Sequence, residues 1–169
     1  MDARESAPVI VGVVHDQPDA VVLSAVEFAR RFRAELVCAS VERGRYTVQE
    51  REDGSVASLP IDPDLPDLAV EEFPEELERH LATLLQNSGV RWSTRMLAGD
   101  PAHALGRLAD RLDAAMIVVG TREAGLRGSI QELLTGSVAA HLAHRQHRPV
   151  VVIPLDPVPI DHELPWEQG

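Results

Sequence analysis

Lysine is absent from this chain of 169 residues, and all 16 of its basic side chains are arginines. This absence excludes a Walker P-loop, in which a lysine contacts the β- and γ-phosphates, and it excludes chemistry through a lysine Schiff base. Cysteine occurs once, at Cys38, which excludes an internal disulfide and any zinc site built from two or more cysteines.

Long apolar runs are also missing. No run approaches the ~18 residues that a membrane span requires. Residues 1–8 are acidic and polar, unlike the basic and then apolar start of a secretory signal. From these two features we expect a cytoplasmic protein with no membrane contact.

Positive charge is scarce relative to negative charge. The chain has 16 arginines and 27 acidic residues, which gives a formal net charge of −11. Nucleic acids and anionic membranes are bound by clustered positive charge, so we expect neither as a partner.

The length and composition that remain are those of one globular domain, with 44% apolar and 25% charged residues. We expect a tail over residues 1–8, a domain over 9–154 and a proline-rich tail over 155–169. Within the domain, residues 44–74 interrupt the regular pattern as an insertion.

Valine-rich apolar runs without alternation predict strands that are buried on both faces of a parallel sheet. Five strands are expected, over residues 9–14, 35–41, 90–97, 115–119 and 149–154. Four helical stretches separate them, with apolar stripes such as Val22, Ala25, Val26, Ala29 and Phe32. This alternation predicts a single doubly wound α/β domain with strand order 3-2-1-4-5.

The insertion begins with two β-prone stretches around Asp53-Gly54, which predict a β-hairpin over residues 45–59. Residues 62–78 follow, with eight acidic and no basic side chains. Two interpretations of this acidic segment stay open, a solvated linker with an acidic helix face or an arm that docks a partner.

The loop over residues 120–137 is the strongest candidate for a binding site. It follows a buried strand, leads into a helix at Ser137, and contains four glycines, Gly120, Gly125, Gly128 and Gly136. Glycines allow close approach of the backbone, and a helix N-terminus offers free N–H donors, so the loop could cradle a phosphate. Arg122 and Arg127 could add charged hydrogen bonds. The alternative is a plain connector in which Ser137 caps the helix.

Several segments of the chain resemble the universal stress protein (UspA-like) family. They are the five-strand pattern, Gly99-Asp100-Pro101 at a helix start, the strand over residues 115–119 that ends at Gly120, Gly136-Ser137-Val138, and the last strand over 149–154. The resemblance extends from Val9 to Pro154. It implies a homodimer that pairs through residues 149–154 and the C-terminal tail.

The resemblance also implies a nucleotide site. ATP-binding members carry the pattern G-x2-G-x9-G-(S/T) after the fourth strand. Here Gly136 and Ser137 match its end, but Glu123 stands where the second glycine is expected from Gly120. The alternative pair, Gly125 and Gly128, leaves only seven residues before Gly136.

In ATP-binding members of the family, an aspartate just after the first strand lies near the adenine. Backbone groups at the end of the second strand bind the adenine. Val14 and His15 occupy the aspartate position here, and Val41 matches the backbone position. The cofactor implied is ATP or a related adenine nucleotide, with Mg²⁺; another phosphate ligand and no ligand at all stay open. The resemblance assigns ten residues to the site: Val14, Val41, Gly120, Thr121, Arg122, Gly125, Gly128, Gly136, Ser137 and Val138.

Other reactive side chains have simpler interpretations. Cys38 lies inside a predicted strand and is expected to be a core thiol, and Asp100 is expected to cap a helix. His141, His144 and His147 recur every three residues, which spreads them too widely on a helix to hold one metal ion. We therefore expect no metal site and no catalytic residue.

Three functions follow from these features. The first is a homodimeric stress-response module that binds an adenine nucleotide at residues 120–138. The second is a nucleotide-free scaffold that acts through protein contacts. The third is a slow ATPase or autophosphorylating protein, for which the sequence offers no positioned general base.

Overall fold

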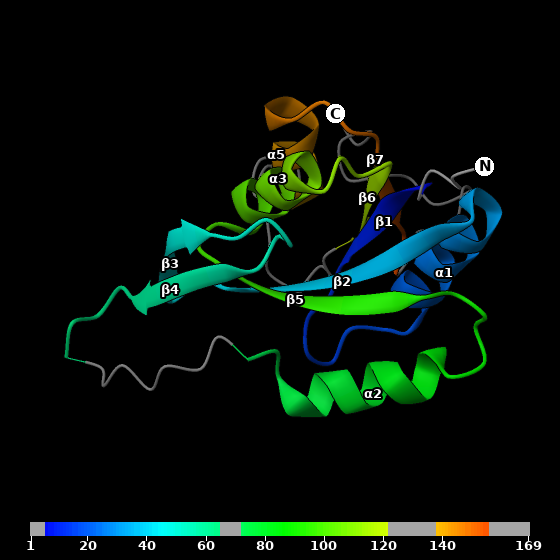
Figure 1. The fold of residues 1–169 in the computed structure, drawn as a ribbon, viewed down its shortest axis with the longest axis horizontal. Coiled ribbons are helices and arrows are strands. Elements are labelled where there is room, and N and C mark those ends of the chain that lie inside the picture. Colours follow the sequence, from blue (N-terminus) through cyan, green and yellow to red (C-terminus); the bar gives the residue numbers. More distant parts are fainter. Residues whose placement is uncertain (1–5, 65–71, 122–137, 156–169) are drawn as a thin grey trace, which may run out of the picture.

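The computed structural model describes residues 6–64, 72–121 and 138–155 (Figure 1). Five strands form a parallel sheet with the order β5-β2-β1-β6-β7. Their bounds are β1 Ser6–Gly12, β2 Ala34–Glu42, β5 Trp92–Ala98, β6 Met116–Gly120 and β7 Val150–Ile153. Counted without the hairpin, this is the predicted order 3-2-1-4-5, so the predicted sheet is confirmed.

Helices cover both faces of the sheet. Their bounds are α1 Ala20–Phe32, α2 Glu75–Leu85, α3 Pro101–Arg111 and α5 Val138–Arg145. Apolar side chains of α1 and α2 pack on one face, while those of α3 and α5 pack on the other. Among the described residues, no helix is both long and apolar enough to cross a bilayer.

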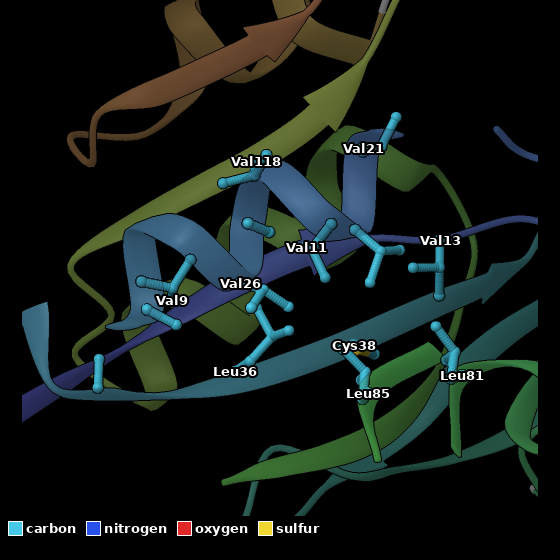
Figure 2. Packing of buried hydrophobic residues seen from close by; sticks show 14 of the residues in the cluster. Val9, Val11, Val13, Val21, Val26, Leu36, Cys38, Leu81, Leu85 and Val118 are labelled. Atoms are coloured by element: carbon cyan, nitrogen blue, oxygen red, sulfur yellow. The ribbon is translucent and has the colours of Figure 1, made fainter. Parts of the chain in front are cut away.

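The core on the α1 side consists of small branched side chains in close contact. Figure 2 shows valines of β1 between α1 and β2, with leucines of α2 closing the cluster beside Cys38. Val9, Val11 and Val118 are fully buried, as expected for strands covered on both faces.

Phe32 was predicted to belong to the buried apolar stripe of α1, and this prediction is wrong. Its side chain is 51% exposed, whereas Val21 near the opposite end of the helix is fully buried. The reason is that α1 ends at Phe32, and Arg33 takes a left-handed conformation (φ 53°) that turns the chain into β2. The last turn of the helix therefore extends past the core.

The predicted hairpin is present as an antiparallel pair, β3 Arg45–Glu50 and β4 Val56–Pro60. It leaves the carboxyl end of β2 and lies beside α3 (Figure 1). Val56 joins the core on the α3 side, and Arg95 of β5 donates a hydrogen bond to the Asp53 carbonyl (2.6 Å). The hairpin is thus packed on the domain along its inner face.

Candidate functional site

The site that the fold favours lies at the carboxyl ends of β1 and β6. These strands are neighbours at the centre of the sheet, where Val9 pairs with Met116 and Val11 with Val118. The helix after β1 packs on one face and α5 packs on the other. The chain connections thus run in opposite directions from β1 and β6. In doubly wound sheets, ligands bind in the crevice that opens at such a switch point.

Val41 lies on one side of this crevice, near the end of β2. The Ala39 carbonyl accepts a hydrogen bond from Val13 N–H (2.8 Å), so the backbone groups of Ala39 face β1. The backbone N–H and C=O groups of successive residues in a strand point to opposite sides. Those of Val41, two residues after Ala39, therefore face the same side as those of Ala39. The β1–β2 ladder ends at the pair Gly12–Ala39. Within the described residues, no strand pairs with this side of Val41.

Val14 lies at the top of β1 and is 61% exposed. Its N–H donates to Oε1 of Gln17 (3.0 Å), and its carbonyl accepts a weaker bond from Gln17 N–H (3.3 Å). Asp16 adopts a positive φ of 59° within the same turn. The loop after β1 is therefore a tight turn closed by Gln17, and Val14 offers an apolar surface at the position where the resemblance implies a carboxylate.

Gly120 ends β6 on the other side of β1. A Cβ at this position would lie 2.9 Å from Val21 Cγ2 and 3.2 Å from Leu155 Cδ1, so only glycine fits without displacement of a neighbour. Thr121 follows, and its Oγ1 accepts a hydrogen bond from Leu155 N–H (2.9 Å). The hydroxyl proton of Thr121 can still be donated to a ligand.

Val138 is the first residue of α5 and is half-buried against the core on the α3 side. Because α5 leads into the start of β7, its N-terminus lies at the carboxyl edge of the sheet, as do Val14, Val41, Gly120 and Thr121. The other predicted site residues, Arg122, Gly125, Gly128, Gly136 and Ser137, lie outside the described residues.

Two histidine–carboxylate pairs attach α2 to the loop after β1. His15 contacts Glu76 (3.3 Å), and His80 contacts Asp19 (2.7 Å). His15 also contacts Asp16 (3.0 Å), and hydrogen bonds to Asp16 and then Glu76 raise the pKa of His15. All of these side chains are largely exposed, so the pairs are screened and orient the loop more than they stabilise the fold.

Two cavities adjoin the hairpin instead of the crevice. One, of about 90 Å³, lies between the hairpin and α3 and is lined by Glu50, His103 and Arg107 among others. Arg107 and Arg111 both bind the Glu50 carboxylate and lower its pKa to about 2. The other, of about 240 Å³, lies between β4, β5 and the residues before α2. In the first cavity, the charges of Glu50, Arg107 and Arg111 are already paired with one another.

Among the described residues, no group of three or more histidine, cysteine or acidic side chains is arranged to hold a metal ion. Cys38 is buried, and burial raises the pKa of its thiol to about 12. Asp100 accepts a hydrogen bond from His103 N–H (2.9 Å) and caps α3. The predicted core thiol and helix cap are confirmed.

Comparison with known proteins gives the same architecture. The family model described as the universal stress protein family matches residues 6–154. The chain belongs to this family. Universal stress protein MJ0531 of Methanocaldococcus jannaschii is 34% identical over 87 residues, which cover 52% of this chain and 49% of that protein. The match thus spans about half the length of that curated relative.

Solved universal stress proteins share the fold over most of the chain. One from Archaeoglobus fulgidus has a TM-score of 0.61 at 22% identity, and covers 87% of this chain and 98% of its own. A universal stress protein in complex with cAMP has a TM-score of 0.55 at 24% identity, with coverages of 88% and 97%. Another, from Archaeoglobus fulgidus in complex with dAMP, has a TM-score of 0.53 at 19% identity, with coverages of 88% and 98%.

Two residues of the crevice were not foreseen from the sequence of this universal stress protein. Gln17 and Leu155 both lie next to Gly120. Leu155 sits just after the last strand, and no sequence motif marks it. The only signal for Gln17 was its place in a short loop between a buried strand and the proline at the start of a helix.

Proposed function

We propose that this universal stress protein is a cytoplasmic, homodimeric module that binds an adenine nucleotide between β1, β2 and β6. The base lies beside Val41, the sugar crosses the end of β1, and the phosphates reach the glycine-rich loop and the N-terminus of α5. The cAMP and dAMP complexes of family members with the same fold support this choice of ligand.

The backbone edge of Val41 is the observation that carries the proposal. One N–H and one C=O face the space beyond the end of β1 on the same side of the strand. The Watson–Crick edge of adenine has the complementary acceptor and donor side by side. Guanine has the opposite order, so a site of this kind discriminates against it because buried groups would be left unpaired.

The phosphates require donors in a chain without lysine. N–H groups at the start of a helix and in a glycine-rich loop bind phosphate through their dipoles, and Gly136 and Ser137 match the family's pattern there. Thr121 Oγ1 adds a hydroxyl donor at the end of β6. If ATP is the ligand, Mg²⁺ would accompany it and neutralise part of the charge of its phosphates.

Calorimetric titration of the purified dimer with ATP, adenosine and GTP tests this function. We expect ATP to bind and GTP to bind at least about tenfold more weakly. Gly136→Asp brings a carboxylate to the phosphates, so it should weaken the binding of ATP far more than the binding of adenosine. Gly89→Asp is the matched control, since Gly89 has a φ of 69°, which aspartate tolerates, and open space around it.

A nucleotide-free scaffold is the second candidate, favoured by the outer face of the hairpin. Tyr46, Val48, Leu59 and Ile61 are between 36% and 62% exposed there. Absence of nucleotide in the heat-denatured extract of the pure protein, together with no thermal shift at millimolar ATP, would reject the nucleotide function in favour of the scaffold. A ligand at 100 times its dissociation constant stabilises a protein by about 2.7 kcal/mol, so such a shift is measurable.

A further inference from the structure

We propose that Gln17 is a phosphate-binding residue, whose side-chain amide donates a hydrogen bond from Nε2 to the phosphate nearest the sugar. The inference rests on the proposed nucleotide site and assigns it a donor that the family's glycine pattern does not contain.

The carboxamide of Gln17 is held in one orientation. Its Oε1 accepts the hydrogen bond from Val14 N–H (3.0 Å), which fixes oxygen and nitrogen because an N–H cannot donate to an NH2 group. Nε2 consequently points away from Val14 and toward β6. A Cβ on Gly120 would lie 3.4 Å from Nε2, so the amide reaches the end of the neighbouring strand.

Nε2 is available to a ligand. Gln17 is half-buried, and none of the described residues accepts a hydrogen bond from Nε2. The side chain has lost much of its rotational freedom to the bond with Val14, so a second bond from Nε2 costs little further ordering. This is the arrangement expected of a preorganised donor.

The order of the strands places Gln17 on the path of the ligand. Val41 is on β2, Gly120 is on β6, and β1 lies between them. Neighbouring strands are about 4.8 Å apart, so β2 and β6 are separated by about 10 Å, the span of a nucleoside and its first phosphate. A nucleotide with its base at Val41 must cross the end of β1, where Nε2 of Gln17 meets the sugar–phosphate junction.

Gln17→Glu isolates the donor. The carboxylate keeps the shape of the side chain and still accepts the bond from Val14 N–H, but it removes the donor and places a negative charge beside the phosphate. Gln86→Glu is the matched control, because Gln86 is an exposed residue at the end of α2 and its substitution changes the net charge by the same amount. Titration of the wild type and both variants with adenosine, AMP and ATP measures the effect.

We expect Gln17→Glu to lower the affinity for AMP and for ATP by about tenfold or more, and the affinity for adenosine by less than twofold. We expect Gln86→Glu to bind all three ligands like the wild type. An equal loss for adenosine and AMP, or no loss for either, would overturn the assignment while ATP binding by the wild type stands. If the wild type binds no nucleotide, the proposed function fails and Gln17 fails with it. Unchanged melting temperature of Gln17→Glu without ligand separates a binding effect from a collapsed loop.

Discussion

At the scale of single residues, Gly54 determines how closely the hairpin approaches the domain. Its φ is 82°, a conformation that glycine adopts without strain, and a Cβ there would collide with Cδ1 of Leu108 on α3. The backbone of the hairpin turn thus packs directly on the leucine side chains of the helix.

We expect Gly54→Ala to lower the free energy of unfolding by about 1–3 kcal/mol, because the new methyl group meets both a strained backbone and an occupied space. Urea denaturation followed by circular dichroism measures this change. Gly44→Ala, at an exposed position with an ordinary contact to Glu42 at 3.4 Å, serves as the control. An equal effect of the two substitutions would show that Gly54 is not a close-packing position.

Single residues were predictable from the sequence where their chemistry is local. Asp100 could be identified as a helix cap because a cap bonds a backbone N–H three residues away, and Cys38 as a core thiol because it lies within an apolar strand. Gln17 could not be identified, since its significance arises from Val14 and from Gly120 on a strand more than 100 residues later. Such a cross-strand placement has no signature in the local sequence.

At the scale of elements, one carboxylate provides the ion pairs between the hairpin and α3. Glu50 of β3 is bound by Arg107 and by Arg111 (2.8 Å to Oε2), and only 19% of its side chain is exposed. The hydrogen bond from Arg107 is the main cause of its lowered pKa, about 2 against an ordinary 4.5.

Because the pKa of Glu50 is lower in the folded state, its contribution to stability is fully present above about pH 4.5 and is lost as the pH falls toward 2. At pH 7 we expect Glu50→Gln to lower the free energy of unfolding by about 1–2 kcal/mol, a value reduced by the partial exposure of the arginines. The difference from the wild type should shrink between pH 5 and pH 2.5 in urea titrations. A constant difference over that range, or an equal one for the exposed Glu52→Gln, would contradict this account.

The elements themselves were well predicted, because apolar runs and turn residues carry a strong local signal. Asp53-Gly54 indicated the hairpin, and the strand-to-helix alternation indicated the sheet order. The packing of the hairpin on α3 was not predicted, since its two salt bridges join Glu50 to arginines that lie 57 and 61 positions later in the chain. Charge alone did not indicate which of the many arginines would pair with Glu50.

At the scale of the whole molecule, β7 is one of the two edge strands of the sheet that the described residues form, and β5 is the other. It pairs with β6 on one side, and Val152 is 42% exposed. An apolar edge strand is prone to aggregate unless a second chain covers it. We therefore propose this edge as the surface through which the dimer forms.

We expect Val152→Arg to convert the dimer to a monomer, because each interface would then bury two unpaired cations. Sedimentation velocity at micromolar concentration distinguishes the two states. Leu23→Arg is the matched control: Leu23 is 48% exposed on α1, which covers a face of the sheet, and we expect this variant to remain dimeric. A monomeric wild type would reject the dimer, and a dimeric Val152→Arg would show that the interface lies elsewhere.

The outer face of the hairpin carries Tyr46, the single tyrosine of the chain, and it is 48% exposed. Nitration of the phenol ring would consequently label the one tyrosine, on the hairpin and outside the proposed nucleotide crevice. The fold thus supplies its own reporter: the rate at which this ring reacts measures how often the hairpin is shielded by another molecule, with no label to be engineered.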